Sequence, residues 1–192
     1  MTTATPTLAW QIAPRSRTTT LIAVVAVAAL TALAAQIRIP IPGSPVPITG
    51  QTFAVLLGGA ALGWRAGAAS QLLYLALGAV GLPVFTEASG GIDVLYGATA
   101  GYLVGFVFAA ALTGWLAERR WERRVLPALA TFGAGNLIIY LLGVPWLMVV
   151  TGWGLQEAVV NGALVFVVGD LIKIAAAAGL TPAAWKLLGR RD

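Results

Sequence analysis

The chain has 192 residues, of which 59% are hydrophobic and only 10% are charged, whereas an average soluble domain has roughly 25% charged residues. This composition argues against a soluble globular domain and against intrinsic disorder, and the absence of cysteine excludes a disulfide framework. An integral membrane protein that crosses the bilayer several times remains. At roughly 20 apolar residues per crossing, the length fits about six spans.

Histidine is absent as well, which removes histidine-based acid–base catalysis, cysteine nucleophiles and the usual zinc sites. There is no Gly-rich Walker loop, so this chain does not hydrolyse ATP. Intramembrane hydrolases need a Ser–His or paired-Asp arrangement, and phosphatidyl-transfer enzymes need clustered acids. Because the chain has one acid deep in a span, we expect no enzyme activity and no cofactor.

The formal net charge is +5. In a soluble protein this excess would suggest a nucleic-acid partner. In a membrane protein the better explanation is Lys and Arg in cytoplasmic loops, which set orientation. We therefore expect no nucleic-acid partner.

The first eighteen residues are polar and include Arg15 and Arg17, so we expect a cytoplasmic N-terminal segment over 1–18. The apolar run over 19–37 follows. A basic start before an apolar run also fits a signal peptide, but this run is longer than a signal-peptide apolar region. We interpret it as the first transmembrane helix.

A proline-rich segment over 38–47 interrupts the helices, since Pro40, Pro42, Pro45 and Pro47 forbid a helix and favour an extended path. It is too apolar for a solvated linker, so we expect it to pack across the top of the bundle. The next two apolar stretches, 51–63 and 66–80, predict a helical hairpin that turns at Arg65.

The remaining segments alternate between loops and spans. A Gly-rich loop over 81–97 precedes a fourth span at 99–116, and a highly charged loop over 118–124 precedes a fifth at 126–143. We expect an interfacial segment over 145–154, where Trp146 and Trp153 suit the membrane boundary, and a sixth span over 157–180. The predicted domains are one six-helix membrane domain over 19–185 and a basic cytoplasmic tail over 186–192.

The distribution of basic residues predicts that both termini are cytoplasmic. With the N-terminus inside, the outer loops carry only Arg38, and Lys173 lies within a span. The inner segments then carry ten basic residues: Arg15, Arg17, Arg65, Arg119, Arg120, Arg123, Arg124, Lys186, Arg190 and Arg191. The proline-rich segment and the Gly-rich loop both fall outside, where they are either plain connectors or the walls of a ligand site.

Asp170 and Lys173 lie in the sixth hydrophobic stretch, three residues apart and so on one helix face. A charge at bilayer depth costs about 2.5–3.5 kcal/mol, and such residues usually face a wet cavity or the bundle interior. The pair could be a self-neutralising ion pair that holds helices together, part of a proton relay, or a polar clamp for a ligand. We favour the clamp. Gln51, Gln71 and Asn136 are weaker evidence, since they could simply bond between helices.

Five sequence blocks resemble the BioY family of biotin transporters, and they occur in order over most of the chain. The blocks are Ile39-Pro-Ile-Pro-Gly with Val46-Pro-Ile-Thr-Gly-Gln-Thr52; Tyr74-Leu-Ala-Leu-Gly-Ala-Val-Gly-Leu-Pro-Val-Phe85; Ser89-Gly-Gly91; Gly101-Tyr-Leu-Val-Gly-Phe106; and Gly169-Asp-Leu-Ile-Lys173.

The resemblance implies the substrate-binding (S) component of an energy-coupling factor (ECF) transporter, an all-α protein of the cytoplasmic membrane with six transmembrane helices. It implies high-affinity binding of biotin at the extracytoplasmic side. The implied partners are a transmembrane coupling protein and two cytoplasmic ATPases. In such components small residues of the first helix contact the coupling protein, and Ala28 and Ala32 are the candidates here.

The resemblance also implies a pocket. Asp170 and Lys173 belong to it, with Asp170 accepting a ureido N–H and Lys173 donating to the ureido oxygen or to the carboxylate. Phe85 and Tyr102 supply apolar wall. The loop that closes over the ligand contains Thr86, Glu87 and Ser89. Glu87 departs from the family pattern, in which small or amide residues are more usual, and 97–101 departs from the usual Gly-Pro-Thr-Gly-Gly.

Other functions stay open at this point. The same fold could bind another vitamin, such as thiamine or riboflavin. The protein could also act as a solitary or homo-oligomeric biotin permease without an ATPase module. A purely structural membrane protein would leave the cost of the intramembrane charges unexplained.

Overall fold

A computed structural model describes residues 6–189, and most of these residues are α-helical. The α-helices are α1 (Leu8–Ile12), α2 (Arg17–Gln36), α3 (Gln51–Leu62), α4 (Trp64–Ala79), α5 (Ala100–Ala117), α6 (Val125–Thr151), α7 (Leu155–Gly162) and α8 (Val167–Leu188). Short 3₁₀ turns are η1 (Thr86–Ala88), η2 (Ile92–Tyr96), η3 (Trp121–Arg123) and η4 (Leu164–Phe166). The strands β1 (Arg38–Ile39) and β2 (Ile48–Thr49) pair antiparallel, with Arg38 opposite Thr49.

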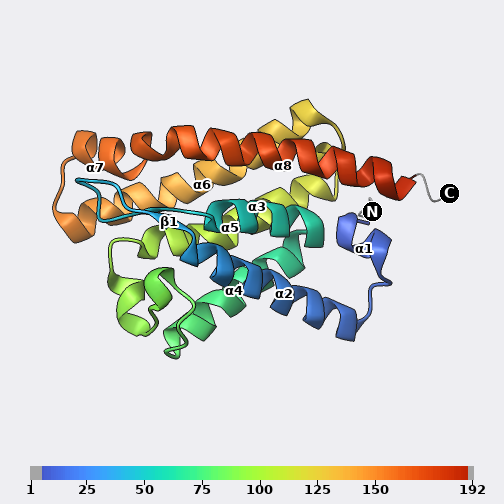
Figure 1. Cartoon of the computed structure of the whole chain (residues 1–192), viewed down its shortest axis with the longest axis horizontal. Helices are drawn as coiled ribbons and strands as arrows, with labels where there is room; N and C mark the ends of the chain where they lie inside the picture. The colour runs from blue at the N-terminus through green and yellow to red at the C-terminus, as the bar shows by residue number, and fades with distance from the viewer. Residues whose placement is uncertain (1–5, 190–192) are drawn as a thin grey trace.

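The long helices form one bundle along the long axis of the molecule (Figure 1). The end of α8 and α1 lie at one end of it, and α7 and β1 lie at the opposite end (Figure 1). The proline-rich segment is extended, as expected, and it forms the β1–β2 hairpin at the α7 end. Chain segments that the sequence assigns to opposite sides of a membrane therefore lie at opposite ends of the bundle.

Within residues 6–189, four elements are long and apolar enough to cross a membrane: α2, α5, α6, and α7 with α8 counted together. The spans expected at 19–37 and 99–116 correspond closely to α2 and α5. The hairpin helices are shorter, since α3 has 12 residues and α4 has 16. At 1.5 Å per residue they are about 18 and about 24 Å long, less than the roughly 30 Å hydrocarbon core.

The hairpin between α3 and α4 turns at Gly63 rather than at the expected Arg65. Gly63 has a φ of +84°, a conformation that side-chain-bearing residues rarely adopt. The turn packs directly against α5, because a Cβ on Gly114 would lie 2.4 Å from the Gly63 carbonyl carbon. Because neither Gly63 nor Gly114 has a side chain, the hairpin can bend at Gly63 and contact α5 there.

Helix α6 is longer than the expected fifth span at 126–143 and continues through Pro145 to Thr151. Most of the segment over 145–154, expected from the sequence to be separate from the fifth span, is therefore part of α6. A membrane helix tolerates an internal proline when neighbouring groups support the freed backbone. Here α5 packs closely alongside, and the Trp146 indole N–H donates to the Gly97 carbonyl at 2.9 Å.

The expected sixth span at 157–180 is broken into α7 and α8 by η4 and Ala163. The break lies beside Tyr102 of α5, whose hydroxyl donates to the Gly162 carbonyl at 2.7 Å. The Tyr102 hydroxyl therefore satisfies a backbone carbonyl at the residue where α7 ends. Helix α8 itself continues to Leu188 and so includes Lys186 of the expected tail, whereas Arg190 and Arg191 lie outside the described residues.

The end of the bundle that carries α1 is tied together by polar contacts from tryptophans. The Trp10 indole donates to the Leu62 carbonyl at 2.9 Å, and the Trp185 indole donates to Glu122 Oε1 at 2.8 Å. Glu122 is only 1% exposed, and the Arg123 guanidinium lies over the Trp185 ring. The highly charged loop expected on the cytoplasmic side thus buries one of its carboxylates against α8.

Helix α5 lies at the centre of the bundle, and most of its residues are buried. Its contact with the hairpin depends on small residues, because a Cβ on Gly59 would lie 2.4 Å from Thr113 Oγ1 and 2.5 Å from the Ala110 carbonyl oxygen. Close backbone approach of this kind is a main source of helix association in membranes.

We predict that Gly59→Ala destabilises the protein by about 1–3 kcal/mol, because the added methyl must push α3 away from α5. Gly133→Ala is the matched control, since a Cβ there meets nothing within 4 Å. The melting temperature of the purified protein in detergent measures both. Equal melting temperatures for the two variants would contradict the packing described here.

We also predict a pH-dependent effect of Glu122→Gln. Burial raises the pKa of the Glu122 carboxyl above its ordinary value of 4.5, and hydrogen bonds and Arg123 offset this only in part. The folded protein therefore holds this proton more tightly than the unfolded chain, so ionisation costs stability as pH rises above that value. The variant should gain melting temperature relative to the unmodified protein from about pH 5 to about pH 8. Glu157→Gln, at an exposed position of α7, should show no such trend.

Candidate ligand-binding cavity

A cavity of about 240 Å³ opens at the α7 end of the bundle. Its walls come from the proline-rich segment, the loop after α4, and helices α3, α4, α5, α6 and α8. Small-molecule sites are typically concave and mostly apolar, with a few convergent polar groups. The polar groups here fall into two clusters, one deep and one at the mouth.

Asp170 is the centre of the deep cluster, and the residue is only 5% exposed. Oδ1 accepts from Lys173 Nζ at 3.0 Å and from the Thr52 hydroxyl at 3.4 Å. Oδ2 accepts from Asn136 Nδ2 at 3.0 Å and from the Tyr140 hydroxyl. A carboxylate has about four lone-pair positions, so every one is engaged by a donor from α3, α6 or α8. An N–H group of a ligand would have to replace one of these four donors. The hydrogen bond from Thr52 is the weakest candidate to keep, because its length of 3.4 Å exceeds the 3.0 Å of the bonds from Lys173 and Asn136.

Among residues 6–189, Lys173 Nζ has two hydrogen-bond partners, so one of its donors remains available. Its ammonium group has three N–H bonds, and two of these are directed to Asp170 and to the Thr52 hydroxyl, each at 3.0 Å. The side chain is 19% exposed and lines the cavity. The remaining N–H suits a neutral oxygen acceptor such as a carbonyl, because Asp170 already balances the positive charge.

The apolar wall contains Phe85, which is 2% exposed and packs edge-on against Tyr74 with ring centres 5.4 Å apart. The ring lies against the backbone of α4, where a Cβ on Gly78 would approach its Cζ to 2.1 Å. The Tyr74 hydroxyl accepts from Gln51 Nε2 at 2.7 Å. This wall is rigid, since each of its members is fixed by another.

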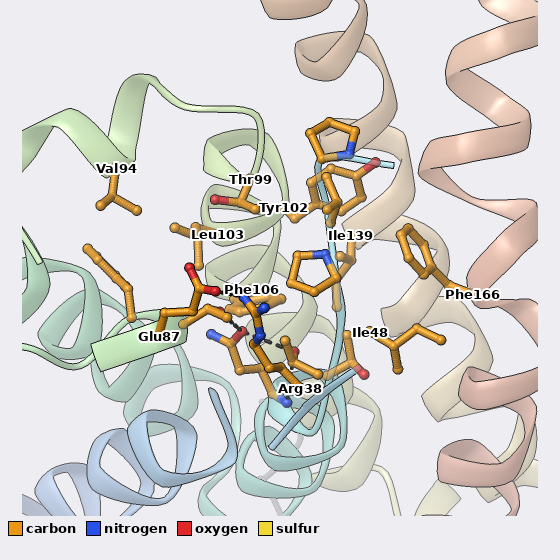
Figure 2. Close-up of a pocket in the computed structure, with 18 of the residues that line it drawn as sticks. Arg38, Ile48, Glu87, Val94, Thr99, Tyr102, Leu103, Phe106, Ile139 and Phe166 are labelled. Atoms are coloured by element: carbon orange, nitrogen blue, oxygen red, sulfur yellow. Dashed lines mark hydrogen bonds and ion pairs between the residues drawn. The ribbon is translucent and has the colours of Figure 1, made fainter. Parts of the chain in front are cut away.

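Tyr102 supplies a second part of the wall, where it is labelled with Ile139 and Phe166 in Figure 2. Its hydroxyl bonds to the Gly162 carbonyl, and its ring covers Gly143 of α6. The expected role of Tyr102 as apolar wall fits this placement, because its polar atom is already bonded to the protein.

The loop over 85–89 lies at the mouth. Glu87 points toward Arg38 of β1 and forms an ion pair with it (Figure 2). Gln36, on the last turn of α2, accepts from the Ala88 N–H at 3.0 Å and donates to the Phe85 carbonyl at 3.0 Å. The Ser89 hydroxyl closes the turn by donating to the Thr86 carbonyl at 2.7 Å. The loop is thereby fastened to both α2 and β1.

The structure brings together all seven residues expected to form a pocket, since each lines the same cavity: Phe85, Thr86, Glu87, Ser89, Tyr102, Asp170 and Lys173. Sequence reasoning missed Thr52, Tyr140 and Arg38. The spacing of Asn136 and Tyr140, which are four apart and so share a helix face, was the available signal for the α6 contribution. In the sequence, Asn136 is only weaker evidence for a ligand site, with an interhelical bond as the alternative.

The structure places Ala28 differently from the expectation for a partner contact. It is 2% exposed and packs inside the bundle, so its side chain does not reach the outer surface of α2. Ala32 is partly buried against the same core. The outward face of α2 instead carries large apolar residues: Leu21, Ile22, Val25, Leu30 and Leu33. In this helix the stripe of Ala28 and Ala32 therefore packs against other helices of the same chain.

We predict that Tyr140→Phe lowers the melting temperature of the ligand-free protein, because it leaves a buried carboxylate one donor short at a cost of about 1–3 kcal/mol. Tyr96→Phe is the control, since Tyr96 is 68% exposed. Equal stability of the two variants would show that the Tyr140 hydroxyl does not satisfy Asp170.

Known proteins are similar to this chain both in sequence and in fold. The BioY family model matches residues 4–190. The biotin transporter BioY of Rhizobium etli is 40% identical over 141 residues, covering 70% of this chain and 75% of the relative. The probable biotin transporter BioY of Pyrococcus horikoshii is 42% identical over 149 residues, covering 78% and 85%. A crystal structure described as the S-component for biotin from an ECF-type ABC transporter superposes with a TM-score of 0.81 at 26% identity, covering 88% of this chain and 92% of that one. This chain is a member of the BioY family.

Proposed function

We propose that this protein binds biotin with high affinity and takes it up across the cytoplasmic membrane as the S component of an ECF-type transporter. Membership of the BioY family and the likeness to a biotin S-component support this proposal. The observation that carries it is the match between the cavity and the ligand. Biotin has a ureido group with two N–H donors and a carbonyl, an apolar ring system and a carboxylate tail.

The deep cluster suits the ureido group. The free N–H of Lys173 donates to the ureido oxygen, and Asp170 accepts a ureido N–H once the Thr52 hydroxyl turns away. Phe85 and Tyr102 lie along the apolar rings, while Thr86, Glu87 and Ser89 form the loop over the ligand. Charged groups at bilayer depth are retained where they serve such a site.

The orientation follows from the basic residues. The α1 end of the bundle carries Arg15, Arg17, Arg65 and the charged loop around η3, and basic loops face the cytoplasm. The cavity lies at the other end and therefore faces outward. Helices α2, α3, α4, α5, α6 and α8 form the membrane domain over 19–185, with 1–18 and 186–192 on the cytoplasmic side.

The energy for uptake comes from a transmembrane coupling protein and two cytoplasmic ATPases. The outward face of α2 is the surface we assign to the coupling protein, in place of Ala28 and Ala32, because it is apolar and exposed over most of its length. Where no coupling protein touches it, this face meets membrane lipid. A solitary biotin permease, alone or as a homo-oligomer, is the alternative.

We predict that Asp170→Asn or Lys173→Ala lowers biotin affinity by roughly a hundredfold or more, because each breaks a buried charge pair at the binding site. The proteins should still insert into the membrane. Equilibrium binding of labelled biotin to each purified variant measures the loss, with Lys186→Ala on the exposed end of α8 as the control. Unchanged affinity in either site variant would contradict the site assignment.

Substrate identity is tested with the unmodified protein and a panel of labelled biotin, thiamine and riboflavin. Binding of biotin alone supports the proposal. Binding of thiamine or riboflavin in preference to biotin would identify an S component for another vitamin. Uptake by cells that express this chain without any coupling protein or ATPase would favour the solitary permease.

A further inference from the structure

Among the described residues that line the cavity, the cations are Arg38 and Lys173. A ligand with a carboxylate could in principle bring it to either one. The two differ in how firmly the protein already holds their charges, and this difference decides between them.

Lys173 is committed to Asp170. The two lie three residues apart on α8, the Asp170 side chain is 7% exposed, and Asn136 and Tyr140 fix the carboxylate from the opposite side. If an incoming carboxylate took Lys173 as its partner, Asp170 would be left buried beside a second negative charge. Removing the partner of a buried ion is strongly unfavourable, so the deep end of the cavity favours the neutral end of the ligand.

Arg38 is held far less firmly. Its partner Glu87 is 62% exposed and Arg38 itself is 34% exposed, so water solvates both groups and the pair contributes little to stability. The two residues lie on different elements, Arg38 on strand β1 and Glu87 on the 3₁₀ turn η1. Another carboxylate can replace Glu87 because nothing buried is left unpaired when the exchange takes place.

The backbone of the loop does not depend on the ion pair. Gln36 holds both the Phe85 carbonyl and the Ala88 N–H. Glu87 has a φ of +63°, a left-handed conformation that is uncommon in residues other than glycine. In that conformation the Glu87 side chain points toward Arg38 (Figure 2). The side chain can leave while Gln36 keeps the loop in place.

We propose that Arg38 binds the carboxylate of the ligand at the mouth of the cavity, and that Glu87 occupies this position in the empty protein as an internal competitor. This inference rests on the proposed function, since it assigns the two ends of biotin. The guanidinium group suits the role because its planar fork matches a carboxylate. The ureido group then lies deep, at Lys173 and Asp170, and the tail points outward.

Binding of two ligands tests the assignment: biotin, and its uncharged amide of the same length. The variants are Arg38→Gln, Glu87→Gln and the double variant, with Arg65→Gln at the opposite end of the bundle as the control for a lost charge. We expect Arg38→Gln to weaken biotin binding roughly tenfold or more and to leave the affinity for the amide within about twofold.

Glu87→Gln should strengthen biotin binding several-fold, because the competitor is gone, and it should leave the amide unaffected. In the Arg38→Gln background the same substitution should have no effect on biotin. The gain from Glu87→Gln should also fall with added salt, since salt screens exposed ion pairs.

Two results would overturn the inference. If Arg38→Gln weakens biotin and the amide equally, Arg38 does not recognise the carboxylate. If Glu87→Gln weakens biotin binding, Glu87 closes the mouth over the ligand and does not compete with it. Failure of the unmodified protein to bind biotin or its amide would instead contradict the proposed function.

Discussion

The buried carboxylate of Asp170 is the interaction on which the cavity depends. It gathers donors from three helices, with Thr52 on α3, Asn136 and Tyr140 on α6 and Lys173 on its own helix. In a nonpolar medium an unpaired charge is too costly to persist, so these helices can separate only if all of those bonds are replaced. The Asp170 charge, which raises the free energy of membrane insertion, therefore also fixes the geometry of the site.

The bundle also requires that helix backbones approach one another closely, and small residues allow this. Helix α5 reaches the backbones of α3, α4 and α6 because Gly59, Gly114 and Gly105 leave no room between them. Lipid offers no hydrophobic driving force between helices, so contact area and polar bonds must hold the bundle. Short helices such as α3 can then be accommodated, since they pack against α5 along their length.

Hydropathy and charge distribution predict the long helices and the two ends of this molecule well. The positions of α2 and α5 follow from apolar runs bounded by polar residues, which is a local signal. The break before α8 and the continuation of α6 through Pro145 could not be predicted, because at both places the chain contacts a segment far away in sequence: Tyr102 of α5 bonds to Gly162, and Trp146 of α6 bonds to Gly97. The candidate site divides in the same way. Asp170 and Lys173 are easily recognised because they are charged residues in a hydrophobic stretch. Thr52 and Tyr140 cannot be recognised in this way, because they meet Asp170 only when α3, α6 and α8 pack together.

Gln36 joins two parts of the protein that face different surroundings. It belongs to α2, whose outer side is apolar and exposed, and it also grips the backbone on either side of Glu87. The backbone on both sides of Glu87 is therefore positioned by α2, so the place of the cavity rim depends on the place of that helix.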